Sequence, residues 1–170
     1  MTMTVGEYKV LADKGLVIWD DTCNELGLKH FLFHGTCLGM YRDGVYIKND
    51  DVDVGVLCSD DDFLNLIEKL KEKGFVELAC ASTFGDDVIC MKFDILNRYH
   101  PSELKFLKTF DTVTYKGRVY NVPHPVEDYL ELHYGDYGDW RVPISNAPST
   151  LVPSGVYESM EHMWLCEKRT

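Results

Sequence analysis

The chain has 170 residues, 45% of them hydrophobic and 26% charged, a size and composition that suit one globular domain with a substantial core. Its formal net charge of −11 repels a phosphate backbone, so we expect no polymeric nucleic acid as a ligand. No apolar run approaches the roughly 20 residues that span a bilayer, so we expect no transmembrane segment. The N-terminus has no basic stretch followed by an apolar core, so we expect no secretory signal.

The first part of the chain predicts helix, strand, helix and strand. Residues 5–26 carry apolar side chains at three- and four-residue spacing, the pattern of an amphipathic helix, and Gly27 ends it. Residues 29–34 predict a short strand that leads directly into a short helix over residues 35–42. Residues 51–57 alternate acids with valines and predict the second strand.

The second part of the chain is richer in strands. The elements predicted there are a helix over 59–73, strands over 75–80 and 88–96, a hairpin over 112–123 and a helix over 125–135. From residue 136 the chain is rich in Gly, Pro and Ser and predicts loop, with one short helix over 157–168. The order of the elements favours an α/β (α+β) fold, a small mixed sheet flanked by helices. We expect one domain over 1–170, with a motif core at about 28–143 and a C-terminal tail over 144–170.

Two carboxylates stand on one face of the second strand. Asp51 and Asp53 project to one side while the valines project to the other, and adjacent carboxylates repel unless a positive charge lies between them. Mg²⁺ or Mn²⁺ would meet that need, because both prefer hard oxygen ligands. Asp94, an acid in an otherwise apolar strand, is the best candidate for a third ligand.

Simpler explanations for these acids remain open. Asp51 and Asp53 could form the solvated face of an edge strand, where charge discourages further pairing. A calcium loop is disfavoured, because the valines mark a strand and Gly55 is misplaced for such a loop. Asp94 could serve only as an ion-pair partner of Lys92, and Lys92 in turn could neutralise a phosphate or merely balance Asp94.

A strand followed by Gly35-Thr36 at the start of a helix favours phosphate binding. Glycine allows an anion to approach the backbone, and the N–H groups of the helix start face that anion. The Thr36 hydroxyl could add a hydrogen bond or cap the helix, and Arg42 could clamp a phosphate or pair with a nearby acid. His34 could shape the turn or be a satisfied buried histidine. His124, between two prolines, could touch a nucleotide base or donor headgroup or be an ordinary loop residue.

Two stretches carry motifs of a known family. They are HGTCLGMYRDGVYIKNDDVDVGV, residues 34–56, and YNVPHPVEDYLELHYGDYGDW, residues 120–140. The first resembles the signature of the LicD/fukutin family, approximately H-G-T-L-L-G-x-x-R, a glycine, then I-P-W-D-D-D-I-D-V-G. The second resembles that family's later segment, where a proline and a helix lead to a Y-G-x-x-W-like stretch. The resemblance covers about residues 30–143 and implies a nucleotidyltransferase-like fold.

This resemblance implies a metal-dependent enzyme. Such an enzyme would transfer a phospho-alcohol, for example phosphocholine or ribitol phosphate, from a CDP-linked donor to a hydroxyl of a sugar or small molecule, in glycan or cell-surface decoration. Carried over to this sequence, Asp51 and Asp53 would bind the catalytic metals, with Asp94 as third ligand or base. Gly35 and Thr36 would hold a phosphate.

The chain departs from this signature at residues 46–49, where Tyr-Ile-Lys-Asn stands in place of Ile-Pro-Trp-Asp. The last two acids of the motif remain, so we expect metal binding to survive, whereas the altered wall of the site leaves the donor open. Two alternatives follow. One is nucleotidyl transfer, for example from CTP to a phospho-alcohol, and the other is a non-catalytic nucleotide-binding module.

Six cysteines are widely spaced and include no C-x-x-C pair. Four of them sit in apolar contexts, so we expect buried reduced thiols and neither disulfides nor a zinc site. Reduced thiols are typical of the cytosol, and they predict a cytoplasmic location.

Overall fold

The computed structural model describes residues 3–47, 51–77, 87–142 and 160–169. The elements are α1 (Val5–Glu25), β1 (Lys29–Leu32), α2 (His34–Arg42), β2 (Val52–Leu57), α3 (Asp60–Glu72), β3 (Phe75–Glu77), β4 (Val88–Leu96), α5 (Pro101–Leu104), η1 (Lys105–Leu107), β5 (Phe110–Tyr115), β6 (Arg118–Pro123), α6 (Val126–Tyr134), η2 (Gly135–Tyr137) and β7 (Met160–Lys168). Lys48 and Asn49, where the chain departs from the family signature, lie outside the described residues.

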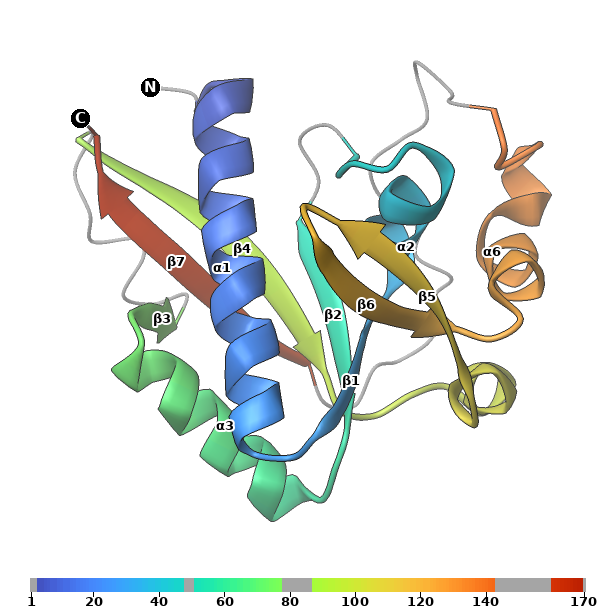
Figure 1. The fold of residues 1–170 in the computed structure, drawn as a ribbon, viewed down its shortest axis with the longest axis horizontal. Helices are drawn as coiled ribbons and strands as arrows, with labels where there is room; N and C mark the ends of the chain where they lie inside the picture. Colours follow the sequence, from blue (N-terminus) through green and yellow to red (C-terminus); the bar gives the residue numbers. More distant parts are fainter. Residues whose placement is uncertain (1–2, 48–50, 78–86, 143–159, 170) are drawn as a thin grey trace.

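A mixed sheet forms the centre of the described fold. Its strand order is β1-β2-β4-β7-β3, with β2 and β4 parallel and the other neighbours antiparallel, while β5 and β6 form a separate hairpin. In Figure 1, α1 crosses in front of the sheet, with α3 below it and α2, α6 and the hairpin on the side of β1. The predicted class, a small mixed sheet flanked by helices, is confirmed.

Helix α1 packs closely against one face of the sheet and buries it. A Cβ added to Gly15 of α1 would lie 2.2 Å from the Phe93 ring of β4, so the helix backbone rests almost directly on that ring. Val52, Val54 and Ile95 are also fully buried. Because side chains alternate along a strand, the residues between these apolar positions face away from α1.

Most predicted elements are confirmed near their predicted bounds. Ser59 caps α3 by accepting a hydrogen bond from the Asp62 N–H, and the three acids of this first turn suit the positive end of the helix dipole. The hairpin turns at Lys116-Gly117 and its first strand begins two residues earlier than predicted. Pro125 precedes the first residue of α6, and Gly135 follows its last.

The end of the first strand was predicted wrongly. β1 ends at Leu32, and His34 is the first residue of α2 with a φ of +36°, a left-handed conformation that is uncommon for a residue other than glycine. The chain therefore turns sharply one residue before Gly35. This turn brings the start of α2 back toward β2.

The predicted C-terminal helix is wrong. Residues 160–168 form β7, which inserts between β4 and β3 and pairs with both. Met163 and Leu165 are buried with one residue between them, the spacing of a strand. The first three residues of the predicted helix, 157–159, lie outside the described residues.

The expectation of reduced thiols throughout is also wrong. Cys90 and Cys166 face each other across β4 and β7 and form a disulfide. Cys23 and Cys37 are free and buried, as expected, and Cys58 is free and half-buried. The cytoplasmic location therefore stays a prediction that the cysteines no longer support.

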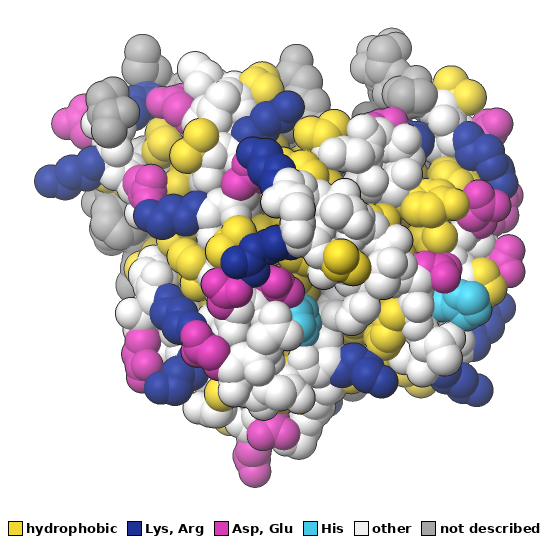
Figure 2. All heavy atoms as spheres, in the orientation of Figure 1, with side chains coloured by type: hydrophobic (Ala, Val, Ile, Leu, Met, Phe, Trp, Pro, Cys, Tyr) yellow, Lys and Arg dark blue, Asp and Glu magenta, His cyan; other side chains and the backbone are white. Residues whose placement is uncertain are grey.

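Charges of both signs are interspersed on the face that carries α1. Figure 2 shows basic and acidic side chains beside one another there, with no continuous basic field. In the described part of the chain, no helix has the length and apolar character needed to cross a membrane.

Candidate active site

Two of the three predicted acids lie side by side on neighbouring strands. β2 and β4 pair in parallel, with Asp53 in register with Asp94. Val52 and Phe93, the residues before them, are buried against the α1 side of the sheet, so both carboxylates leave the opposite face. Neighbouring strands lie about 4.8 Å apart, which puts the two carboxylates within reach of a single cation.

The Gly35-Thr36 turn lies directly against this pair. The Asp53 N–H donates to Thr36 Oγ1 at 2.8 Å, and the Phe33 N–H donates to the Asp53 carbonyl at 3.1 Å. The Thr36 side chain thus holds the start of α2 against β2, the strand that carries Asp53 and is called the acid strand below. Thr36 does not cap the helix, whose N-cap is Phe33. The structure brings together the turn and the acids that the sequence singled out, while their binding roles stay predictions.

Lys92 lies between the acids. Its Nζ is 2.7 Å from Asp51 Oδ2 and 3.1 Å from Asp94 Oδ2, with a side chain 24% exposed. Burial by itself would lower the Lys92 pKa, but the hydrogen bond to Asp51 and the charges of Asp94 and Asp51 outweigh burial and raise that pKa. The ammonium group therefore supplies the positive charge that the repelling carboxylates need.

The chemistry of the acid site fits the predicted metal. Three aspartates offer hard carboxylate oxygens, the ligands preferred by Mg²⁺ and Mn²⁺. As they lie, however, these carboxylates do not form a group with oxygens within 4.8 Å of one another in the described part of the chain. A metal ion and Lys92 would therefore compete for the same negative charge, and metal binding would require the side chains to turn toward one another.

His162 joins the site from β7. Its Nδ1 lies 2.6 Å from Asp94 Oδ1, across the antiparallel pair of β4 and β7. Sequence reasoning missed this residue because it missed the strand. Residues 163–166 form a continuous apolar run, Met-Trp-Leu-Cys, without the alternation that marks a strand, so the sequence carries no clear signal for it.

Two predicted substrate-binding residues have partners elsewhere. The Arg42 guanidinium donates to both carboxylate oxygens of Asp43 and to the Trp140 carbonyl at 3.1 Å. His124 Nδ1 lies 2.9 Å from Asp111 Oδ1, and its side chain is 46% exposed. These are the ion-pair and loop positions named as alternatives, and the substrate contacts of both residues stay predictions.

A second cluster of titratable side chains begins at His34. Its Nε2 lies 3.5 Å from Glu103 Oε1, and His133 Nε2 lies 3.0 Å from the same oxygen. Burial by itself would raise the Glu103 pKa, but the two histidines that face its carboxylate lower it to about 2. Burial lowers the pKa of His34. Sequence reasoning missed Glu103 and His133, because no local motif connects α5 with α6.

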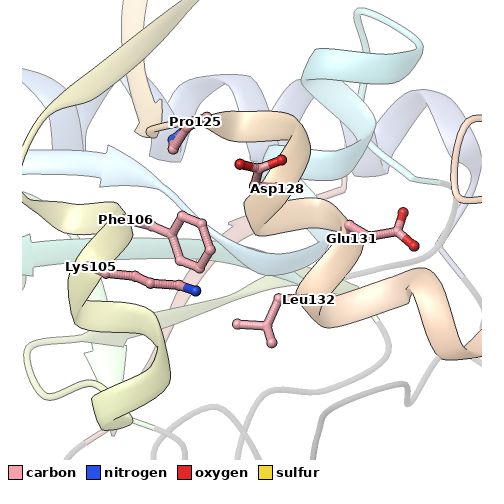
Figure 3. Close-up of a pocket in the computed structure, with 6 residues that line it drawn as sticks. All are labelled: Lys105, Phe106, Pro125, Asp128, Glu131 and Leu132. Carbon is pink, nitrogen blue, oxygen red and sulfur yellow. The ribbon is translucent and has the colours of Figure 1, made fainter.

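A pocket of about 500 Å³ opens between η1 and α6 (Figure 3). It is lined by Lys105, Phe106, Pro125, Asp128, Glu131 and Leu132. None of the predicted site residues is among them, and the acids on α6 disfavour a phosphorylated ligand there. We therefore place the candidate active site at the acid pair and not in this pocket.

Comparison with known proteins gives the family. The family model described as LicD/FKTN/FKRP, nucleotidyltransferase domain, matches residues 27–146. The chain is similar to "Ribitol-5-phosphate transferase FKTN" of Mus musculus, with 30% identity over 82% of this chain and 36% of that protein. It is 28% identical to the protein of the same name from Macaca fascicularis, over 94% of this chain and 41% of the relative. The chain thus spans less than half the length of these relatives. The extent of the family match shows that the chain belongs to the LicD/FKTN/FKRP nucleotidyltransferase-domain family.

Proposed function

We propose that the chain is a transferase that moves a polyol phosphate or related phospho-alcohol from a CDP-linked donor to a hydroxyl acceptor. The observation that carries this proposal is the register of Asp53 with Asp94 beside the turn that Thr36 fastens to the acid strand. The relatives are named for transfer of ribitol 5-phosphate, which supports a polyol phosphate as the transferred group.

The start of α2 is the proposed seat for a donor phosphate. The N–H groups of a helix start attract anions, and glycine at position 35 carries no side chain that would keep an anion from the backbone. Gly35 and Thr36 are buried, so a bound phosphate would require the residues over this turn to move. The His34 N–H already donates to the Tyr129 hydroxyl at 3.0 Å, so the N–H groups of Gly35 and Thr36 would bind the phosphate. Arg42 would have to leave Asp43 to assist.

The transfer exchanges one bond to phosphorus for another. The acceptor oxygen bonds to the phosphorus that carries the alcohol, the bond from this phosphorus to the CMP oxygen breaks, and CMP leaves with the electron pair. A carboxylate within hydrogen-bond reach can take the hydroxyl proton, a role that we assign to Asp94 if it does not complete the metal site. Asp51 and Asp53 would hold Mg²⁺ or Mn²⁺, which supplies positive charge to the phosphoryl oxygens.

The products distinguish this reaction from its alternative. Purified protein would be incubated with CDP-ribitol, CDP-glycerol or CDP-choline together with a sugar or polyol as hydroxyl acceptor, or with CTP and ribitol 5-phosphate. Each reaction would be run with Mg²⁺ and with EDTA. Transfer from a CDP-alcohol releases CMP, whereas nucleotidyl transfer from CTP releases pyrophosphate. We expect Mg²⁺-dependent CMP release that falls about 100-fold or more in Asp53→Asn.

The matched control is Asp61→Asn, which removes an exposed acid from the first turn of α3. It should retain wild-type activity. Pyrophosphate without CMP would replace the proposed reaction by nucleotidyl transfer. Absence of both products, together with no nucleotide-dependent thermal shift, would overturn both enzymatic functions.

A further inference from the structure

Three buried side chains from separate parts of the chain converge outside the acid site. His34 begins α2, Glu103 lies in α5 and His133 lies in α6. Their side chains are 10%, 1% and 4% exposed. The two imidazole nitrogens and the carboxylate oxygen lie within 4.8 Å of one another.

The spacing of these atoms suits a tetrahedral metal. Metal–ligand bonds of about 2.0–2.1 Å place two ligands of a tetrahedral zinc ion roughly 3.3–3.4 Å apart. Glu103 Oε1 lies 3.0 Å from His133 Nε2 and 3.5 Å from His34 Nε2, one distance just below and one just above that value.

The hydrogen bonding around Glu103 leaves one oxygen directed at both histidines. Glu103 Oε2 accepts from the His100 N–H at 3.0 Å, while Oε1 is the oxygen near both imidazoles. His133 Nε2 is buried and, despite its 3.0 Å distance from Oε1, makes no hydrogen bond of good geometry within the described residues. An imidazole nitrogen and a carboxylate oxygen that lie close together without a well-formed hydrogen bond are placed so that they can share a metal as two of its ligands. Hydrogen bonds such as that from the His100 N–H orient metal ligands in other proteins.

We propose that His34, Glu103 and His133 form a binding site for a divalent transition metal of the zinc class. Two imidazoles and one carboxylate make a known zinc ligand set, whereas the three aspartates offer oxygen alone and suit Mg²⁺. The site fastens the start of α2 to α5 and α6, and so steadies the backbone of the Gly35-Thr36 turn. It does not depend on the proposed reaction.

The test uses the tag-free chain, because a histidine tag would itself bind metal. The metal content of the purified protein would be measured, and protein stripped with EDTA would be titrated with Zn²⁺ and separately with Co²⁺. We expect about one zinc per chain, a higher melting temperature with Zn²⁺, and the visible absorption of tetrahedral Co²⁺. Mg²⁺ in excess should not displace the cobalt.

His133→Gln should weaken zinc binding about 100-fold or more. The control His124→Gln alters an exposed histidine and should bind zinc as the wild type does. Asp53→Asn should also retain zinc, which separates this site from the proposed active site. Because His133→Gln could fail to fold, the wild-type cobalt spectrum decides independently: no tetrahedral spectrum and no zinc-dependent stabilisation would overturn the proposal.

Discussion

His162 Nδ1 lies 2.6 Å from Asp94 Oδ1, while Lys92 Nζ lies 3.1 Å from Oδ2 of the same carboxylate. Each oxygen of Asp94 therefore has its own partner, one from β7 and one from β4. A carboxylate held at both oxygens keeps one orientation, which a metal ligand or general base requires.

Replacing His162 should lower activity with little loss of stability. His162→Ala removes the partner of Asp94 Oδ1, and the loss of such an orienting bond typically lowers activity about 10- to 100-fold. The His162 side chain is 42% exposed, so the melting temperature should change little. Steady-state kinetics and thermal melts would separate these effects.

The control for this experiment lies one residue earlier on the same strand. Glu161→Ala changes an exposed side chain of β7 and should keep wild-type kcat. His162→Gln retains a side-chain donor and should recover part of the activity. Full activity in His162→Ala would show that Lys92 alone suffices to hold Asp94.

Removing Lys92 should increase the response to Mg²⁺. Lys92→Met leaves Asp51 and Asp94 without their shared ammonium, so the metal-free protein should lose about 1–3 kcal/mol of unfolding free energy. Mg²⁺ would then neutralise the acids without competition, and it should raise the melting temperature of Lys92→Met more than that of the wild type. An equal shift in both proteins would argue that the metal and Lys92 occupy different places.

Strand β2, which carries Asp53, could be predicted from the sequence because its alternation of aspartates and valines lies within one short stretch. Asp53 alternates with valines within one strand, and side-chain period alone assigns the two faces. β7 could not be assigned this way, because its apolar residues also allow a helix, and only its place between β4 and β3 decides the conformation. The cluster of His34, Glu103 and His133 depends on three separate elements, so no local pattern reveals it.

An ion pair between the two ends of the chain should shape its acid sensitivity. The hydrogen bond from Arg169, followed by that from the Thr4 backbone, lowers the Glu7 pKa from 4.5 to about 2. The unfolded chain therefore binds the proton more readily, so this contribution to stability is present above about pH 4.5 and is lost as the pH falls toward 2.

Glu7→Gln should consequently show a shallower loss of melting temperature over this interval. Arg169→Gln removes the larger cause of the lowered Glu7 pKa and should show most of the same change. Over this pH interval the double variant should match Glu7→Gln, because the carboxyl group whose pKa Arg169 lowers is already absent. Additive effects of the two substitutions would assign the acid sensitivity to other groups.

Reduction should destabilise the sheet. The disulfide between Cys90 and Cys166 closes a loop between residues 76 positions apart. In the chain-entropy view, a crosslink of this length contributes about 4 kcal/mol. Peptide mapping without reductant should recover the linked Cys90–Cys166 pair, and the reductant should lower the melting temperature of the wild type but not of a Cys90→Ser/Cys166→Ser variant. Two free thiols at these positions would contradict the bridge.

Gly39 in α2 should tolerate no side chain. An added Cβ would lie 2.5 Å from the Val45 carbonyl oxygen and 2.9 Å from the Ile47 nitrogen, and neither backbone atom can rotate away. We expect Gly39→Ala to lose about 1–3 kcal/mol of unfolding free energy, as overpacked sites do. Residues 45–47 lead toward the acid strand, so affinity for a nucleotide donor should fall as well.

Gly6→Ala is the matched control, because it adds the same methyl group to a helix. The nearest atom to a Cβ at Gly6 is Thr4 Oγ1 at 3.9 Å, so nothing must move. Alanine favours the helix over glycine by up to about 1 kcal/mol, and the melting temperature should therefore rise. Opposite signs in the two variants would isolate the close approach over Gly39, whereas a gain in both would mean that α2 lies farther from residues 45–47 in solution.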